Sequence, residues 1–313
     1  MEKWKFMKMF KPEGVHWEVR NDYTIDEIQS AQKNKDTLEA KVLKCDEKLN
    51  LIVDLGDNIT GIIKYNDIEF SPFGKMTRSV SIMAKVGKCV KFKVGCITKK
   101  GNSYTVECSR AAAQKECYDE YISKLTPGDI IPARILHIEK YGMFCDIGCG
   151  LVALLPIENV SILRNTEPQK IFRTWKDLFV VVKDIDDEGK ITLTHKELLG
   201  TWDEEVSKFK VGETVSGTVK TIEDYGVFIE LSQNLAGLAE VAKNVRVGDK
   251  VNVNIKDIMA DKMKIKLIII SSETPDPEYI EKPKFKYTMK HGHIDEWKYS
   301  PENCKRYIGT KFN

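Results

Sequence analysis

Hydrophobic and polar residues follow the same order in two stretches of the chain. The first stretch begins at Gly128 and the second at Gly212, an offset of 84 residues. Both carry the pattern Ile-Glu-x-Tyr-Gly-x-Phe-x-(Asp/Glu)-(Ile/Leu), at 138–147 and at 222–231. A weaker third copy lies upstream, at 37–45 and 49–56. This recurrence predicts that the chain repeats one small structural unit.

Each copy is predicted to contain five short strands, because runs rich in Val, Ile and Leu alternate with Gly and Asp turn signals. The strands predicted for the second copy are 129–139, 141–147, 150–155, 178–185 and 190–195, and those for the third are 213–223, 225–231, 235–239, 249–257 and 263–270. A closed barrel accommodates five such strands, whereas an open sheet would leave edges exposed. The predicted fold class is therefore mainly β, with three tandem five-stranded barrels.

Short helices are predicted between the barrels. In the linker 110–125, apolar residues at four-residue spacing follow an Ala-Ala-Ala run, and the linker 194–209 carries an apolar stripe that Gly200 interrupts. A capping-box pattern at 24–27 predicts the start of another helix. These helices could either fix the spacing of the barrels or only cap them. The expected domains are an N-terminal extension (1–35), a divergent first barrel (36–110), a second barrel (127–196), a third barrel (211–272) and a basic, aromatic tail (273–313).

The second strand of each copy carries the candidate chemistry. Side chains alternate across a strand, so Phe144 and Phe228 are predicted to point out of their barrels. The expected inward residues are Met143, Cys145 and Ile147 in one copy and Val227, Ile229 and Leu231 in the other, with Asp146 and Glu230 pointing outward. A glycine is the second residue of each strand, Gly142 or Gly226, and each can host a bulge. Such a bulge would turn Tyr141 and Tyr225 onto the outer face.

A Tyr–Phe pair on an outer face can stack unpaired bases, a contact worth about 1–3 kcal/mol per base. The alternative is that the aromatic rings plug a barrel end or cover a neighbouring element. The same pair recurs at the same strand position in two copies, which favours the stacking platform.

The pattern Tyr-Gly-x-Phe-x-(Asp/Glu), followed by a Gly-Leu strand and a closing Lys-Ile-x-Leu strand, resembles the S1 RNA-binding domain, an OB-fold barrel. The resemblance covers roughly residues 36–272 and is closer in the second and third copies than in the first. Three copies in tandem are similar to the short ribosomal S1 proteins of Gram-positive anaerobes.

The resemblance implies single-stranded RNA (mRNA) binding linked to the small (30S) ribosomal subunit and translation, in the cytoplasm. The RNA-binding residues that it implies are Tyr141, Phe144, Asp186, Lys190, Tyr225, Phe228 and Lys264. In the third copy the acidic position falls on Ala260, with Asp261 beside it. Many family members have a histidine where this chain has Pro156 and Glu240, so a contact through that histidine is not expected here.

The first copy departs from the pattern, because Leu49 and Ile52 occupy its two aromatic positions. Its charge balance is +4 over 36–110, against −2 over 127–200 and 0 over 211–272. A basic surface without aromatic rings can hold phosphate or an acidic protein surface without reading bases. In the family, first domains often dock to the ribosome through protein contacts, and we expect the same of this copy.

Net charge, cysteine spacing and apolar runs narrow the class of protein further. The net charge of +2 argues against a strongly basic binder of duplexes, so stacking must supply part of any affinity for nucleic acid. The eight cysteines include no C-x-x-C pair and no zinc-like spacing, so we expect reduced thiols, no metal and no cofactor. Residues 1–10 lack the apolar core of a signal peptide, and the longest aliphatic run, Leu267–Ile270, is too short to span a bilayer. We therefore expect a soluble intracellular protein that does not insert into a membrane.

No catalytic motif is evident: a Walker A loop, G-x-S-x-G and H-E-x-x-H are all absent, so we do not expect an enzyme. The alternative to a ribosome-linked RNA binder is an accessory or scaffold protein of the transcription or RNA degradation machinery. The tail 283–313 is basic and aromatic, so it could add an RNA contact, cap the third barrel or be disordered. His291 and His293 within it are expected to be surface residues rather than metal ligands.

Overall fold

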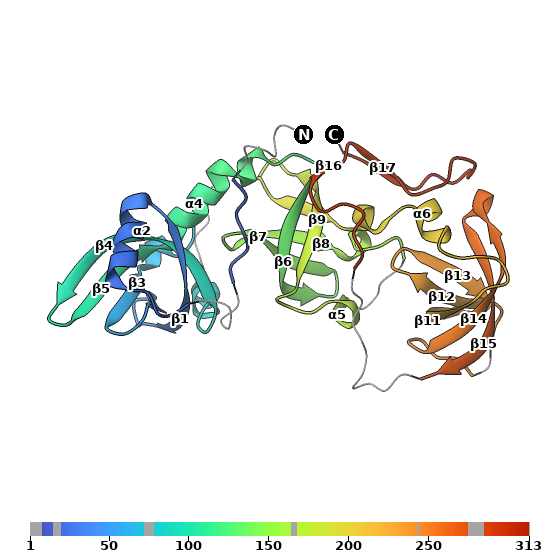
Figure 1. Cartoon of the computed structure of the whole chain (residues 1–313), viewed down its shortest axis with the longest axis horizontal. Coiled ribbons are helices and arrows are strands. Elements are labelled where there is room, and N and C mark those ends of the chain that lie inside the picture. The colour runs from blue at the N-terminus through green and yellow to red at the C-terminus, as the bar shows by residue number, and fades with distance from the viewer. Residues whose placement is uncertain are drawn as a thin grey trace.

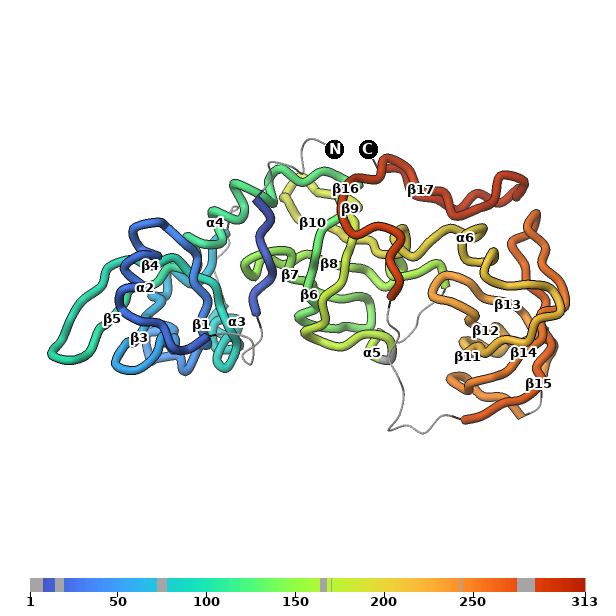
Figure 2. Tube along the Cα trace, viewed as in Figure 1, coloured from blue at the N-terminus to red at the C-terminus, as the bar shows by residue number. Residues whose placement is uncertain are grey.

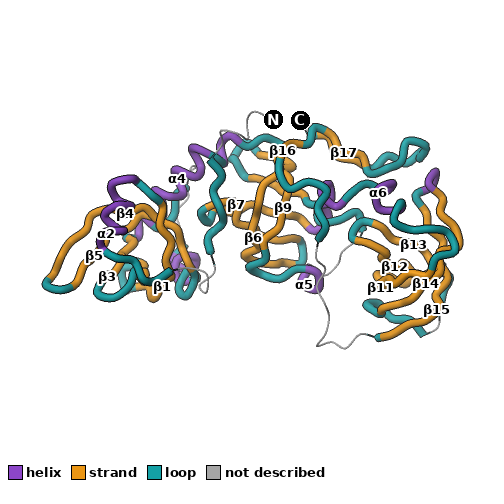
Figure 3. The backbone as a smooth tube through the Cα atoms, viewed as in Figure 1, coloured by secondary structure: helices purple, strands orange, loops and turns teal. Residues whose placement is uncertain are grey.

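The computed structural model describes residues 8–14, 20–71, 78–163, 168–242, 244–274 and 285–312. These residues form three β-barrels that lie in a row along the long axis of the molecule (Figure 1). Strands make up most of each barrel, and helices lie between the barrels or at their rims (Figure 3). The predicted fold of three tandem five-stranded barrels is confirmed. Residues 1–7 and 15–19 of the predicted extension and 275–284 and 313 of the predicted tail lie outside the described residues.

All three barrels share one pairing order, in which the third strand lies parallel to the fifth and the fourth closes the ring on the first. Barrel one consists of β1 (Thr37–Cys45), β2 (Leu51–Asp54), β3 (Ile59–Ile63), β4 (Cys89–Lys100) and β5 (Ser103–Ser109). Barrel two consists of β6 (Asp129–Glu139), β7 (Gly142–Gly148), β8 (Leu151–Pro156), β9 (Asp177–Ile185) and β10 (Ile191–Thr194). Barrel three consists of β11 (Thr214–Glu223), β12 (Gly226–Ser232), β13 (Leu235–Ala239), β14 (Lys250–Met259) and β15 (Lys264–Glu273).

Each barrel encloses its own apolar core, built from the inward side of its strands. In β7 the predicted inward residues Met143, Cys145 and Ile147 are buried. In β12, Val227 and Ile229 are buried as well. Leu231, at the end of that row, is only partly buried. Five of the eight free cysteines are buried and pack as small apolar side chains, namely Cys89, Cys108, Cys117, Cys145 and Cys149.

Helices lie at the rims of the barrels and in the linkers. The capping box at Thr24 starts α2 (Ile25–Asn34) as predicted. The first linker forms α4 (Arg110–Glu120) and η2 (Ile122–Lys124). The second linker is not one helix, because Gly200, with φ +92°, separates η4 (Lys196–Leu199) from α6 (Trp202–Val206). The remaining short helices are η1 (Tyr65–Asp67), α3 (Ser79–Met83), η3 (Ile157–Asn159), α5 (Pro168–Ile171) and η5 (Ala260–Lys262).

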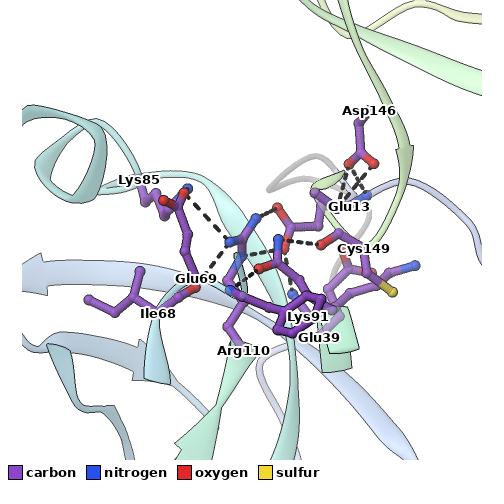
Figure 4. A network of polar contacts seen from close by, with 12 residues as sticks. Glu13, Glu39, Ile68, Glu69, Lys85, Lys91, Arg110, Asp146 and Cys149 are labelled. Atoms are coloured by element: carbon purple, nitrogen blue, oxygen red, sulfur yellow. Dashed lines mark hydrogen bonds and ion pairs between the residues drawn. The ribbon is translucent and has the colours of Figure 1, made fainter. Parts of the chain in front are cut away.

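Residues 8–14 lie between barrels one and two and hold them together (Figure 4). The Glu13 carboxylate accepts hydrogen bonds from Arg110 Nε at 2.7 Å and Arg110 Nη2 at 3.0 Å. The Glu13 backbone N–H donates to Asp146 Oδ2 of barrel two at 2.8 Å. Arg134 of β6 donates to the Glu13 carbonyl at 3.0 Å. Glu13 therefore links the start of α4 to the second strand of barrel two.

Asn234, in the turn between β12 and β13, joins barrel three to barrel two. Its side chain is fully buried, and Oδ1 accepts from the backbone N–H of Ile162 at 3.1 Å. Nδ2 donates to the carbonyls of Lys196 and Gly200 in the second linker, at 3.0 and 3.2 Å. One turn of barrel three is thus fixed to the segment that follows β8 and to the linker.

The described part of the C-terminal tail crosses barrels two and three (Figure 2). The short strand β16 (Gly292–His293) pairs with β6. Beyond it, β17 (Glu296–Lys298) and β18 (Gly309–Lys311) form a hairpin. Trp297 and Tyr299 are buried in the core of barrel three, while Phe285 and Tyr287 pack against the core of barrel two. The described tail is therefore folded and caps barrel three, as one of the alternatives predicted, and it covers part of barrel two as well. These four aromatic rings are not free to stack on RNA.

Candidate nucleic-acid interface

The outer face of β7 carries the first predicted aromatic pair. Phe144 is half-buried on this face, and Tyr141 lies in the turn between β6 and β7, with 56% of its surface exposed. The two ring centroids are 6.3 Å apart and the rings meet edge to face at 89°. One ring thus stands in solvent while the other lies against the sheet.

Barrel three reproduces this arrangement. Tyr225 lies in the turn before β12 and is 68% exposed, and Phe228 is half-buried on the strand. Their centroids are 6.1 Å apart at an interplanar angle of 89°. Two barrels that share only part of their sequence therefore hold the same pair in the same geometry.

The glycines before the two phenylalanines do not host the predicted bulge. Gly142 pairs in register with Glu139, and Gly226 with Glu223. The irregularity lies instead on the preceding strand, between Ile135 and His137 in barrel two and between Val219 and Thr221 in barrel three. Glycine is needed for another reason, because a Cβ on Gly142 would lie 2.5 Å from the Leu155 carbonyl oxygen, as would one on Gly226 from that of Ala239. The tyrosines reach the outer face because they belong to the turn.

Strand register identifies neighbours of each phenylalanine that the sequence pattern missed. Phe144 is opposite His137 on one side and Leu154 on the other, and Leu154 is beside Thr192. The same positions in barrel three are Thr221, Leu238 and Lys266 around Phe228. Paired residues point to the same side of a sheet, so each row forms one continuous outer surface. Only the pairing of the third strand with the fifth brings Thr192 and Lys266 into these rows, and that pairing is not visible in the local pattern.

The predicted acidic and basic residues lie in the turn between the last two strands. In barrel two, Asp186 Oδ1 accepts from the backbone N–H of Glu188 at 3.0 Å and of Lys190 at 2.8 Å, so this carboxylate closes the turn. Lys190 Nζ is 2.7 Å from Glu188 Oε2, and this hydrogen bond raises the pKa of Lys190. Lys190 lies in the turn two residues before Thr192, which belongs to the aromatic row. In barrel three, Lys264 is exposed at the first position of β15.

Asp146 departs from the prediction that it points into solvent. It lies on the outer face, yet its exposed fraction is 0% because residues 8–14 cover it. Burial raises the pKa of Asp146 to about 7, and the neighbouring Glu13 charge acts in the same direction. Backbone N–H groups of Glu13, Gly148 and Gly150 donate to the carboxylate and oppose this shift. Asp146 therefore belongs to the junction between barrels, whereas its counterpart Glu230 forms a salt bridge of 2.8 Å with Lys220.

Barrel one has the same strand geometry without the aromatic rings. Ile52 is opposite Lys44 and Ile62, and Ile62 is beside Glu107, so Ile52 occupies the Phe144 position. Leu49 lies in the preceding turn, with φ +61°. Aliphatic side chains offer no π face, so this row lacks the means to stack a base.

One of the two tail histidines lies against a carboxylate of barrel two. His293 Nδ1 is 2.8 Å from Asp129 Oδ1, which ties the tail to the start of β6. In the described part of the chain, no three His, Cys, Asp or Glu side chains are grouped so that they could hold a metal ion. None of the helices in the described ranges is long and apolar enough to cross a bilayer.

Barrel two matches a known protein family. Residues 124–196, which include all of barrel two, match the family described as "S1 RNA binding domain". Barrel two is therefore an S1-type domain within a row of three barrels, and the resemblance seen in the sequence is confirmed.

Its relatives include proteins named "Small ribosomal subunit protein bS1". The protein of that name from Streptococcus pneumoniae is 28% identical over 60% of this chain and 50% of its own length, and the one from Staphylococcus aureus is 26% identical over 81% and 66%. This chain thus spans half the length of the first relative and less than two thirds of the second. A solved multidomain protein with nucleic acid binding domains from Streptococcus pneumoniae shares 11% identity over 75% of this chain and 73% of its own, at a TM-score of 0.24.

Proposed function

We propose that this protein binds single-stranded RNA, such as mRNA, across barrels two and three. The observation that carries the proposal is the Tyr–Phe pair, which occurs with the same edge-to-face geometry in both barrels. Its proposed RNA contacts are Tyr141, Phe144, Asp186, Lys190, Tyr225, Phe228 and Lys264. The domains proposed for this function are the barrels at 36–110, 127–196 and 211–272, flanked by the extension 1–35 and the tail 273–313.

Aromatic platforms favour single strands over duplexes. A ring can stack only on a base whose face is free, and the bases of a duplex are already stacked on one another. The net charge of +2 supplies little general attraction to a nucleic-acid backbone, so stacking must contribute much of the free energy of binding. The same physics predicts tolerance of base sequence, because every base has a π face.

Replacing both phenylalanines tests this proposal. We expect Phe144→Ala and Phe228→Ala each to weaken binding of a single-stranded oligouridylate by roughly 5- to 150-fold, because each removes a stacking contact of about 1–3 kcal/mol. The two sites lie in different barrels, so the losses should multiply in the double variant. Fluorescence anisotropy with a labelled RNA measures these dissociation constants.

Tyr307→Ala is the matched control, since Tyr307 is 54% exposed but belongs to the tail hairpin region rather than to a platform. Its affinity should equal that of the unmodified protein. A double phenylalanine variant that binds the oligouridylate as tightly as the unmodified protein would rule out the platforms as the RNA site.

We also propose that barrel one docks to the small ribosomal subunit, that the protein acts there in translation as a cytoplasmic binding protein, and that it has no catalytic role. The names of the relatives support this association, and the +4 balance of residues 36–110 supports docking through a basic surface. We expect Lys44→Glu with Lys48→Glu to reduce co-sedimentation of the full chain with 30S subunits. Lys298→Glu with Lys305→Glu, the same change in charge on the tail, should leave it unchanged. Equal co-sedimentation of both variants would contradict docking through barrel one.

A further inference from the structure

The two aromatic platforms lie beside turns of opposite charge. Register sets the equivalent segments, because Thr192 is opposite Asp184 in barrel two and Lys266 is opposite Asp257 in barrel three. The segment 183–192 contains two lysines and four carboxylates, a balance of −2. The segment 256–266 contains four lysines and two aspartates, a balance of +2. A phosphate near the first platform therefore meets net negative charge, and one near the second meets net positive charge.

Lys266 places part of this positive charge next to the aromatic pair of barrel three. It is exposed, and its neighbours Ile265 and Leu267 are buried in the core, so β15 directs the Lys266 side chain outward. Lys266 lies two strands from Phe228, with Leu238 between them. Adjacent strands are about 4.8 Å apart, so the two Cα atoms are about 10 Å apart, within the combined reach of a stacked nucleotide and a lysine side chain.

The corresponding position in barrel two cannot make such a contact. Thr192 is half-buried and uncharged in the row of Phe144. The nearest predicted cation, Lys190, is already paired with Glu188 at 2.7 Å. Asp184, opposite Thr192 on β9, is exposed and would repel a phosphate.

We infer that the two barrels contact RNA in different ways, with Lys266 as a phosphate-binding residue of barrel three. Barrel three, through Lys266 together with Lys264, supplies the salt-dependent part of the affinity. Barrel two stacks bases with little contribution from the backbone charge. This inference rests on the proposed function and specifies how the two platforms differ in their contacts with the same ligand.

The salt dependence of binding tests the inference in the full chain. The dissociation constant for a labelled single-stranded oligouridylate is measured over a range of KCl concentrations, and the logarithm of the association constant is plotted against that of the salt. For a single strand, each phosphate contact contributes about 0.7 to the magnitude of the slope. Lys266→Thr should lower that magnitude by about 0.7, and Thr192→Lys, the reciprocal exchange in barrel two, should raise it by about 0.7.

Lys250→Thr is the matched control. Lys250 is exposed on the same barrel at the far end of β14, opposite Glu273 and away from Lys266. Its replacement should leave the slope unchanged. If Lys266→Thr and Lys250→Thr give the same slope as the unmodified protein, the inference is wrong, although the proposed function stands. If the unmodified protein fails to bind the oligouridylate at any salt concentration, the proposed function itself is wrong. Lys266→Thr alone decides the inference if the half-buried Thr192→Lys variant does not fold.

Discussion

Single outward-facing residues in these barrels meet one of two environments, water or a covering segment of the chain. Tyr141 and Tyr225 are in water, where they are available to a ligand. Asp146 is covered by residues 8–14. His195, just after β10, lies between two segments: its Nδ1 is 2.9 Å from the Val160 carbonyl oxygen in the segment after β8, and its Nε2 is 3.3 Å from the Tyr287 hydroxyl of the tail. The covering segments therefore decide which outer residues can act on a ligand and which stabilise the fold.

The burial of His195 predicts a pH-dependent stability. Burial lowers its pKa to about 4, below the unfolded value near 6.5, so the unfolded chain binds the extra proton first. The stabilisation from neutral His195 is therefore present above about pH 6.5 and is lost as the pH falls toward 4. Between pH 7 and 4.5 we expect the free energy of unfolding to fall by about 2–3 kcal/mol more in the unmodified protein than in His195→Gln.

Urea unfolding of both proteins at the two pH values measures this difference, and the titration of other groups cancels between them. His137→Gln, the same substitution at an exposed histidine, is the control. Equal losses in the unmodified protein and in His195→Gln would show that the His195 pKa is not lowered by folding.

At the scale of elements, the strands follow local pattern closely. Each of the ten strands predicted for barrels two and three begins and ends within three residues of the observed strand. Alternation of apolar side chains is a property of neighbouring residues, so the sequence reveals it directly. The placement of Phe144 and Phe228 on the outer face follows from the same alternation.

Contacts between segments far apart in the sequence cannot be predicted from the alternation of apolar residues. Glu13 and Asp146 are 133 residues apart, and no pattern along the chain connects them. The sequence likewise left an RNA contact, a cap and disorder open for the tail. In the structure Trp297 and Tyr299 are buried against barrel three, where apolar surface makes burial favourable. In the candidate site, the local pattern predicts the aromatic rings. The position of Lys266 beside them becomes visible only in the pairing of β13 with β15.

The N-terminal segment provides a test at this scale. Arg110 is 1% exposed, and without Glu13 its buried charge keeps only a longer contact, 3.9 Å from Arg110 Nη1 to Glu69 Oε1. Loss of one partner from a buried ion pair costs about 3–5 kcal/mol, and we expect this loss of unfolding free energy from Glu13→Ala. Asp119→Ala removes the partner of Lys115 in an exposed pair, and its cost should stay within about 0.5 kcal/mol.

Urea denaturation followed by circular dichroism compares the two variants. If Glu13→Ala costs no more than Asp119→Ala, then Glu13 does not stabilise the junction between barrels one and two.

At the scale of the whole molecule, the chain's own ends and linkers join the barrels into one array. Glu13 links barrel one to barrel two, Asn234 links barrel three to the second linker, and the tail crosses the second junction. Ser161, beyond the end of β8, donates to the carbonyl oxygen of Gln233 at 2.9 Å. The segment after β8 of barrel two therefore contacts the turn after β12 of barrel three. Under the proposed function, two platforms held in this way engage one strand of RNA together, which raises affinity without any new contact.

The dependence of affinity on RNA length tests this account most directly. An OB-fold barrel covers about 4–16 nucleotides, so an oligouridylate of about 8 nucleotides can occupy one platform and one of about 30 can occupy both. We predict that the unmodified protein binds the longer RNA at least about 100-fold more tightly than the shorter one. In Phe228→Ala, which retains only the platform of barrel two, that gain should fall to a few-fold. An equal gain in both proteins would contradict the claim that barrels two and three hold one RNA strand on their aromatic platforms.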